Sequence, residues 1–410
     1  MSGLVVHSAR KVDADGLVDD FWFVADDGVI IATGTGIGWH AAAQGPGRDV
    51  VDAGGHWLTP GFIDLHCHGG GGHPFDDGPE EMLEALATHR AHGTTRSLVS
   101  HVANPLASLR ESLSIVADLV AVDPLILGSH LEGPFLAPSR RGAHDGAFLR
   151  DPGPEMVEEL IGAARGTMRV ATIAPELPNA LESIGVLIEA GVVVSVGHTD
   201  ADYDQAARAF EVGARMLGHA FNAMNGIHHR APGPIIAAFE NPDVTLELIV
   251  DGLHVHPKVA KLAFTAAPGR VALVTDAMAA AGAHDGDYRL GGLNVTVRDG
   301  LAVLSGTSTI AGSTLTQDVA LRNAVTLVGL DPVHAVAALT HTPAHALGED
   351  HRLGRLHAGY AADAVILDHD WTVRRVFADG VPSADPHCTP ARFRMRYSFC
   401  QAGLFAYAYR

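Results

Sequence analysis

The stretch that decides the fold is Leu58-Thr59-Pro60-Gly61-Phe62-Ile63-Asp64-Leu65-His66-Cys67-His68-Gly69-Gly70-Gly71-Gly72. It opens with a Pro-Gly turn, continues as a short apolar run, and ends in two histidines followed by four glycines. Side chains alternate faces along a β-strand, so His66 and His68 point the same way, about 6–7 Å apart, and Cys67 points the other way. Two imidazoles on one face of a strand end are typical of a metal site. The alternative is a pair of buried, hydrogen-bonded histidines.

The composition is that of a large globular protein. The chain has 410 residues, of which 47% are hydrophobic and 18% are charged, and it is long enough to bury a sizeable core without disulfide bonds. It shows no apolar run long enough to cross a bilayer, and no basic and apolar leader, so we expect neither a membrane span nor a signal peptide. The three cysteines, Cys67, Cys388 and Cys400, form no disulfide framework, and the cytoplasm is therefore the expected location.

The net charge of the chain is -19 with histidine neutral. This value argues against nucleic acid or an anionic membrane as the main partner. Lysine is nearly absent, because the chain contains only Lys11, Lys258 and Lys261. No lysine is therefore available in the stretch between positions 11 and 258.

Both ends of the chain read as β structure. Short alternating segments occur at 4–8, 21–24 and 28–32, and again at 364–368 and 373–380. We therefore predict a small β-sandwich domain formed from residues 1–55 and 353–382, and a separate domain over 56–352. Residues 383–410 form an atypical tail, rich in aromatic residues and arginine, for which an extension, a packing strap and a non-native tail all remain open.

The middle of the chain alternates short apolar strands with amphipathic helices. Strands are predicted at 61–66, 94–100, 125–131, 169–174, 192–197, 215–220, 244–250 and 271–275. Helices are predicted around 80–86 and at 154–164, 179–190, 201–212 and 257–266. Eight β/α alternations predict the α/β class and a (β/α)8 TIM barrel. A doubly wound sheet is the alternative, but no Gly-x-Gly-x-x-Gly turn follows an early strand.

After the eighth strand, the segment 288–304 reads as an inserted hairpin. Residues 314–317 then predict a capping box that opens a helix extending to residue 328.

Potential metal ligands follow the predicted strands at the point where each strand ends. In a TIM barrel the carboxyl ends of the strands form the active site. The residues at these ends are His66 and His68, His130 and Glu132, His198, His219, Asp251 and His254, and Asp276. Such a set at one end of successive strands predicts a metal centre. His89, His92, His101, His284, His351 and His369 have no such placement, so we interpret them as surface or locally hydrogen-bonded residues.

Several motifs resemble a known family. The segment 60–69 is similar to the metal-binding opening of the amidohydrolase superfamily. Taken together, the motifs resemble the N-acetylglucosamine-6-phosphate deacetylases of that superfamily; they lie at 130–135, 141–144, 197–199, 219–224, 251–254, 274–277 and 311–313. The resemblance covers residues 1 to about 382 and implies hydrolysis of the acetamide of an amino-sugar phosphate.

The resemblance implies one or two divalent metal ions per chain. Glu132, His198 and His219 would hold one ion, and His66 and His68, with Glu132 shared, could hold a second. Many amidohydrolases bridge two metals with a carbamylated lysine, but none is available at the middle strands, which leaves Glu132 for this role. Zinc suits this ligand set, and iron, manganese and cobalt remain open.

The resemblance also implies catalytic roles. Asp276 would act as general base and then as general acid; the alternative is a structural cap after the strand. His144 would contact the substrate near its carbonyl oxygen; the alternative is a surface loop residue. Ile310 would pack against the acetyl methyl group.

The substrate phosphate would be bound by the backbone N–H groups of Asn222 and Ala223, with Arg230 and His254. In relatives, such an arginine and histidine can come from the neighbouring subunit, so we expect a homodimer. The galactosamine isomer, or another acyl-amide substrate, remains an alternative. A barrel that has lost catalysis and serves only in binding is the non-enzymatic alternative.

Overall fold

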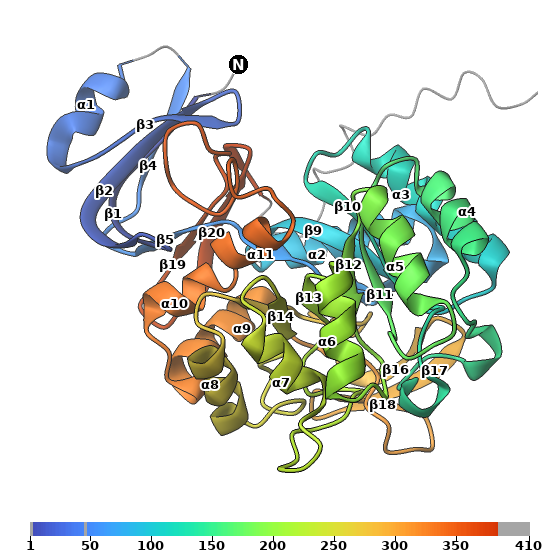
Figure 1. The fold of residues 1–410 in the computed structure, drawn as a ribbon. Coiled ribbons are helices and arrows are strands. Elements are labelled where there is room, and N and C mark those ends of the chain that lie inside the picture. Colours follow the sequence, from blue (N-terminus) through green and yellow to red (C-terminus); the bar gives the residue numbers. More distant parts are fainter. Residues whose placement is uncertain (1–2, 45–46, 384–410) are drawn as a thin grey trace, which may run out of the picture.

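A computed structural model describes residues 3–44 and 47–383. The chain forms a sheet built from its two ends and a barrel built from its middle (Figure 1). Apart from Ser383, the tail predicted at 383–410, with Cys388 and Cys400, lies outside the described residues.

Both chain ends meet in one mixed sheet of eight strands, in the order β21-β20-β19-β5-β1-β2-β3, with β4 paired to β1. The blue and red ribbons of Figure 1 lie side by side in it. Its strands are β1 Gly3–Asp13, β2 Gly16–Asp26, β3 Val29–Thr35, β4 Arg48–Asp52, β5 Trp57–Pro60, β19 Ala364–Leu367, β20 Val373–Ala378 and β21 Val381–Pro382. Phe23, Ile30, Leu58 and Phe377 are fully buried in its core. The N- and C-terminal segments are thus held together by shared apolar burial.

The middle of the chain forms a parallel barrel in the order β6-β9-β10-β11-β12-β13-β14-β15. The strands are β6 Phe62–Asp64, β9 Thr94–His101, β10 Ile126–Glu132, β11 Met168–Ile173, β12 Val193–Val196, β13 Met216–Leu217, β14 Thr245–Leu248 and β15 Val271–Leu273. Each overlaps one predicted strand, and the predicted TIM barrel is confirmed.

The barrel closes just beyond the first and last strands. Cys67 and Ala277 form a parallel bridge. The N–H of Asp276 donates to the carbonyl of His66 over 2.8 Å, and the N–H of His68 donates to that of Ala277 over 2.7 Å. The first predicted site segment is therefore fastened directly to the last one.

A helix follows each barrel strand. These helices are α2 Pro79–Ala91, α3 Leu106–Val120, α4 Pro154–Ala164, α5 Ala180–Glu189, α6 Tyr203–Val212, α7 Gly233–Glu240, α8 Pro257–Ala266 and α9 Gln317–Asn323. Further helices are α1 Trp39–Ala42, α10 Pro332–Ala337 and α11 His341–Ala346. The predictions for α4 and α8 match to the residue, whereas α3 and α7 were not predicted. The amphipathic pattern of α3, which buries Leu109, Leu113 and Val116, would have revealed it.

The predicted capping box at 314–317 is wrong. Helix α9 begins at Gln317, so Thr316 and not Thr314 is its N-cap residue, and it forms no side-chain cap. The Thr314 hydroxyl donates instead to the carbonyl of Gly300 over 2.9 Å. The helical segment does extend to Val328, as a π-helical turn over Ala324–Val328.

The predicted hairpin at 288–304 is part of a three-stranded antiparallel sheet, formed by β16 Gly286–Leu290, β17 Leu293–Arg298 and β18 Leu301–Leu304. A second small hairpin pairs β7 Gly69–Gly70 with β8 His73–Pro74. Both insertions follow barrel strands, so they lie at the end of the barrel where the predicted site residues gather.

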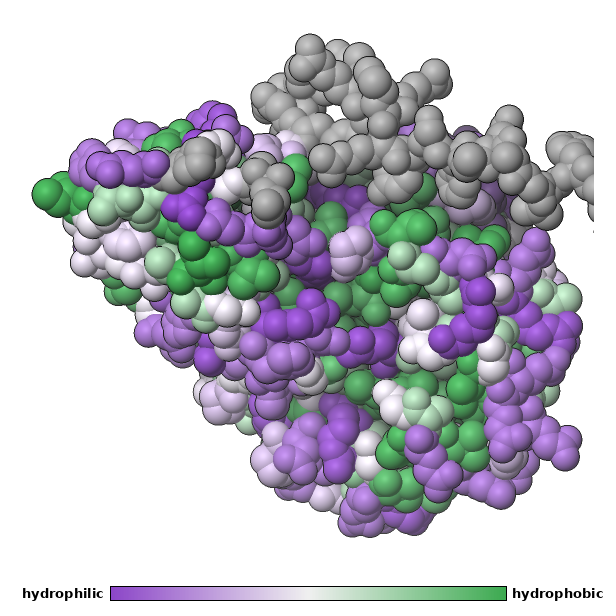
Figure 2. Space-filling view, turned by 90° about the horizontal axis from the view of Figure 1, so that it is seen from above, coloured by the Kyte–Doolittle hydropathy of each residue, from purple (hydrophilic) through white to green (hydrophobic). Residues whose placement is uncertain are grey.

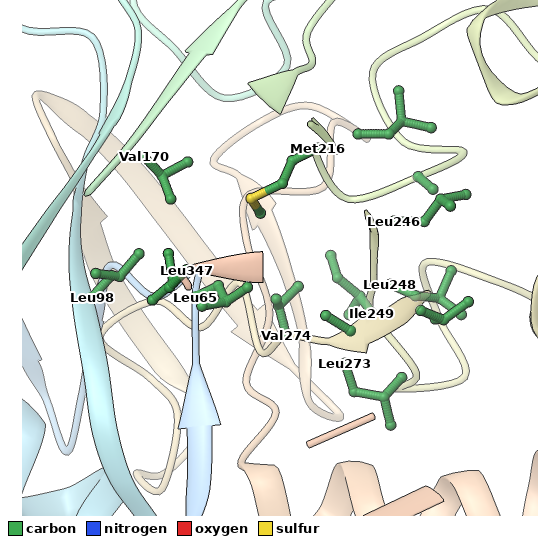
Figure 3. Packing of buried hydrophobic residues seen from close by; sticks show 14 of the residues in the cluster. Leu65, Leu98, Val170, Met216, Leu246, Leu248, Ile249, Leu273, Val274 and Leu347 are labelled. Atoms are coloured by element: carbon green, nitrogen blue, oxygen red, sulfur yellow. The ribbon is translucent and has the colours of Figure 1, made fainter. Parts of the chain in front are cut away.

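The barrel interior and its helices share one apolar core. Figure 3 shows residues of this core, among them Leu65, which follows β6, and Leu98, Val170, Met216 and Leu246, which lie in four other strands. Each is at most 1% exposed, and burying such a side chain contributes about 1.5–3 kcal/mol. This core fixes the positions of the strand ends that carry the polar residues.

Among the described residues, no helix is both long and apolar enough to span a membrane. Figure 2 shows one face of the molecule, on which hydrophobic residues lie in small groups between hydrophilic ones. Such scattered apolar groups are usual on protein surfaces.

Candidate active site

The predicted metal ligands gather at the carboxyl ends of four barrel strands. His66 and His68 follow β6, Glu132 ends β10, His198 follows β12, and His219 follows β13. All five are buried, with exposed fractions of at most 6%. The backbone φ angles of His198 and His219 are 46° and 23°. Such left-handed conformations are unfavourable for these residues and are typical of functional sites, where the surrounding structure holds them.

Glu132 stands at the centre of this group. Its Oε1 atom lies 3.2 Å from Nε2 of His66, 3.1 Å from that of His198 and 3.0 Å from that of His219. Its Oε2 atom lies 3.1 Å from Nε2 of His68. Burial raises the pKa of Glu132, but His66 and the other histidines around it lower it well below its usual value. One ionised carboxylate is therefore shared by both histidine pairs.

The protonation of the His198 ring indicates whether a metal ion fits this group of residues. Its Nδ1 atom lies 2.8 Å from the carbonyl oxygen of Arg140, and a carbonyl can only accept, so the ring proton is on Nδ1. Burial lowers the pKa of His198 to about 4, so the ring is neutral near pH 7. Its bare Nε2 lone pair then faces Oε1 of Glu132. Two acceptors that face each other need a cation between them, and the donor set fits a divalent metal.

Asp276 lies beside the first histidine pair. Its Oδ1 atom is 3.4 Å from Nε2 of His68 and 3.6 Å from Nε2 of His66. Burial raises the pKa of Asp276, but His66 and His68 lower it well below its usual value. The backbone is fixed on both sides, since its carbonyl accepts from the N–H of Ser313 over 2.7 Å. Asp276 thus presents an ionised carboxylate that can accept a proton.

His144 also lies beside Glu132, with its Nε2 atom 3.5 Å from Oε2. The backbone N–H of Ala103 donates to Nδ1 of His144 over 3.1 Å. Nδ1 is therefore the acceptor, and the ring carries its proton on Nε2. His144 is 5% exposed, and it can offer this Nε2–H to an oxygen atom in the site.

A cavity of about 310 Å³ opens over these residues. Of the predicted substrate-binding residues, Asn222, Ala223, His254 and Ile310 line it, whereas Arg230 does not. Arg230 is exposed, and its guanidinium contacts Nε2 of the adjacent His229 over 2.6 Å. The structure thus brings together all the predicted site residues except Arg230.

The loop after β13 has an irregular backbone. The φ angles of Phe221 and Ala223 are 80° and 50°, and the N–H of Asn222 donates to the carbonyl of His219. The N–H of Ala223 has no acceptor among the described residues. His254 is oriented by Asp251, whose Oδ2 atom lies 2.6 Å from its Nδ1. Ala223 therefore offers a free donor to the cavity, which the oriented imidazole of His254 also lines.

Two residues of this region were not predicted. Glu247, in β14, is fully buried and contacts both His66 and His219. Arg140 lines the cavity and binds Asp200 and Asn225. The sequence contains a signal for Glu247. It is a glutamate inside the apolar strand segment 244–250, and an interior strand position rarely carries a charge.

The interpretation of His101 as a surface or locally hydrogen-bonded residue needs correction, whereas His89 is hydrogen-bonded as interpreted but is not on the surface. His101 ends β9, one residue beyond the predicted strand, and is fully buried; neither ring nitrogen has a partner among the described residues. Burial lowers its pKa to about 3. His89 is also buried, where Nε2 lies 2.9 Å from the carbonyl oxygen of Gly69.

Comparison with known proteins agrees with this geometry. A model of the amidohydrolase family matches residues 57–384. The chain belongs to the amidohydrolase family. This amidohydrolase is 36% identical, over 92% of its length and 98% of the relative's, to an N-acetylgalactosamine-6-phosphate deacetylase of Escherichia coli O157:H7. It is 35% identical to an N-acetylglucosamine-6-phosphate deacetylase of Bacillus subtilis (strain 168), over 77% of its own length and 82% of the relative's.

The fold of this amidohydrolase is similar to solved structures. A variant of the N-acetyl-D-glucosamine-6-phosphate deacetylase of Mycobacterium smegmatis, in complex with N-acetyl-D-glucosamine-6-phosphate, superposes with a TM-score of 0.88 at 39% identity. The match covers 94% of this chain and 100% of that one. The predicted resemblance to these deacetylases is therefore confirmed.

Proposed function

We propose that the chain is a metal-dependent deacetylase that hydrolyses the acetamide of N-acetyl-D-glucosamine 6-phosphate to D-glucosamine 6-phosphate and acetate. The main support for this proposal is the position of Glu132, which contacts two pairs of histidines and has the ionised Asp276 beside it. The similarity to deacetylases of N-acetylated amino-sugar phosphates supports the substrate class.

Two groups of residues would hold divalent metal ions. His198, His219 and Glu132 form one, and His66, His68 and the same glutamate form the other. A cation held there would polarise the amide carbonyl and lower the pKa of water. The nitrogen and carboxylate donors favour zinc, with iron, manganese and cobalt as alternatives. The metal content per chain, measured after anaerobic purification, tests whether one or two ions bind.

In the proposed reaction, Asp276 takes a proton from the attacking water as the water oxygen bonds to the amide carbon. The Nε2–H of His144 donates to the carbonyl oxygen as negative charge develops on it. Asp276 then delivers its proton to the amine nitrogen as the carbon–nitrogen bond breaks. Acetic acid, which ionises to acetate in water, and the free amino sugar result, and the carboxylate of Asp276 is regenerated.

The phosphate would lie at the other end of the cavity. The free N–H of Ala223 and the oriented imidazole of His254 are suitable donors, beside Asn222. Ile310 would pack against the acetyl methyl. Arg230 lies outside the cavity lining of its own chain, which favours a role in the site of a neighbouring subunit and therefore a homodimer. The cytoplasm is the location that we propose for this enzyme.

The N-acetylgalactosamine 6-phosphate isomer is a second candidate substrate, because a deacetylase for it aligns over 98% of its length at 36% identity. The two sugars differ only in the configuration of one hydroxyl group. Acetate release from both phosphates, assayed side by side with the metal-loaded enzyme, tests the proposal. We expect the higher kcat/KM for the glucosamine isomer. No acetate release from either compound would contradict the function.

A further inference from the structure

Glu247 is a buried carboxylate to which the proposed reaction gives no task. It lies in β14 and is fully buried. Its Oε2 atom is 3.0 Å from Nδ1 of His66 and accepts from the backbone N–H of His219 over 3.2 Å. One carboxylate oxygen therefore contacts a residue of each histidine pair.

The contact with Glu247 determines how the ring of His66 is used. With Oε2 of Glu247 as the acceptor of this contact, the proton of His66 is on Nδ1. Its Nε2 atom then points toward Glu132, at 3.2 Å, and toward Nε2 of His68, at 3.1 Å. The Nδ1 atom of His68, by contrast, has no partner within the described part of the chain. Among the described residues, His66 is thus the histidine of this pair whose Nδ1 atom is hydrogen-bonded, and this bond fixes the orientation of its ring.

The surroundings leave Glu247 little freedom. A side-chain carbon at Gly218 would lie 3.7 Å from Oε2 of Glu247 and 3.2 Å from Oγ of Ser195. The carboxylate of Glu247 thus lies beside the backbone of Gly218. Glu247 is therefore held in a fully buried position by its contacts with Nδ1 of His66 and the backbone N–H of His219.

We propose that Glu247 is a positioning residue of the metal centre, which holds His66 with Nε2 toward Glu132 and couples this histidine to the backbone of His219. This inference rests on the proposed function and adds a residue to it. Carboxylates that bind the second nitrogen of a metal-ligating histidine fix the tautomer and strengthen the ligand.

The charges of the site agree with this role. Glu132, Asp276 and Glu247 are three carboxylates in contact with His66. Within the described ranges, no lysine or arginine forms an ion pair with any of them. Buried carboxylates need compensating positive charge, and divalent cations would supply it. Loss of one carboxylate should therefore weaken metal binding.

The test measures metal affinity rather than turnover. Purified wild type and Glu247→Gln are titrated with Zn²⁺ in competition with a chromophoric chelator, and the metal per chain is measured by elemental analysis. We expect Glu247→Gln to bind Zn²⁺ about 10- to 100-fold more weakly. The control is Asp123→Asn, a buried carboxylate that pairs with Arg90 on the outside of the barrel, and it should leave the affinity unchanged.

A second variant and a second measurement cover the case in which Glu247→Gln does not fold. Glu247→Asp keeps the charge and should bind Zn²⁺ with intermediate affinity. In ¹⁵N-histidine spectra, the wild type should show His66 protonated at Nδ1, with the signal assigned from His66→Gln. Wild-type affinity in whichever Glu247 variant folds, or a proton on Nε2 of His66, would overturn the inference.

Failure of the inference about Glu247 can be distinguished from failure of the proposed function. If the wild type releases acetate while the Glu247 variant binds Zn²⁺ normally, the inference fails and the function stands. If the variant loses affinity but the wild type releases no acetate from either sugar phosphate, the inference stands and the function fails.

Discussion

The backbone N–H of Ala103 donates to Nδ1 of His144 over 3.1 Å. This hydrogen bond places the ring proton on Nε2, on the side that faces Glu132. Because β9 ends at His101, the loop that carries Ala103 leaves the barrel close to the site. The end of one strand thereby selects the tautomer of a side chain that follows another.

His144→Ala should lower kcat about 10²-fold or more with a smaller change in KM, since the donor acts on charge that develops during the reaction. His144→Gln, whose amide can also donate, should retain more activity. Steady-state kinetics of both variants, at equal metal content, test this role. An alanine variant with normal kcat would leave His144 with the alternative role of a loop residue.

Asp276→Asn should fold and retain metal but lose about 10²- to 10⁴-fold in kcat, because the amide cannot accept the proton of the attacking water. Circular dichroism and metal analysis check the fold and the metal content, and single-turnover assays measure the reaction. Near-normal turnover in a metal-loaded variant would remove Asp276 from the proton transfers.

Arg230→Ala should raise KM for the phosphorylated sugar much more than for the unphosphorylated one. The exposed position of Arg230, outside the lining of its own cavity, makes a stronger test possible. Hybrid dimers of Arg230→Ala and Asp276→Asn chains, isolated with two affinity tags, should contain one intact site and recover about half of the wild-type activity. Hybrids with no recovered activity would mean that Arg230 does not act across subunits.

Arg96 joins the barrel to the sheet made from the chain ends. It is 2% exposed, and it lies in β9 with its Nε atom 2.6 Å from Oδ2 of Asp363, just before β19. Arg96→Met should cost about 3–5 kcal/mol of unfolding free energy, since it leaves a buried carboxylate unpaired. The exposed pair of Arg110 with Glu159 is the control, and Arg110→Met should change stability by less than about 1 kcal/mol. Urea unfolding measures both, and equal losses would contradict this account.

His101 predicts a pH dependence of stability. Its pKa is about 3 in the folded protein, against 6.5 as the ordinary value, because burial disfavours the charged ring. Between these values the unfolded chain binds the extra proton, so stability falls as the pH falls below 6.5, by at most about 1.4 kcal/mol per pH unit from this residue. His101→Leu should reduce the slope by up to this amount in urea unfolding between about pH 6.5 and pH 4.5. An unchanged slope would contradict the burial of a neutral ring.

The fold could be predicted because its signals are local. Apolar strands and amphipathic helices alternate eight times, and the periodicity alone located β6 and α8. Helix α3 was missed although its apolar face is regular. The Thr314 hydroxyl could not be assigned from the sequence, because its partner is the carbonyl of Gly300 in an inserted sheet.

The site residues that lie at strand ends could be predicted from the sequence. Active-site residues of a TIM barrel lie at the carboxyl ends of the strands, and this rule selects Glu132 and Asp276. It could not select Glu247, which lies inside a strand and reaches His66 across the barrel, 181 residues away in sequence. It also missed His101, because the predicted strand stopped one residue short. The contacts that other residues make with the ligands depend on packing between distant strands. The periodicity of the sequence does not show this packing.

In the proposed function, the donors around Glu132 bind a divalent metal that amide hydrolysis requires. The most direct test follows acetate release from N-acetyl-D-glucosamine 6-phosphate while the chelated protein is titrated with Zn²⁺, Mn²⁺ or Fe²⁺. We expect no release without metal, and activity that rises with the metal bound per chain until the site is full. Full activity in metal-free protein, or no acetate release at full metal occupancy, would contradict it.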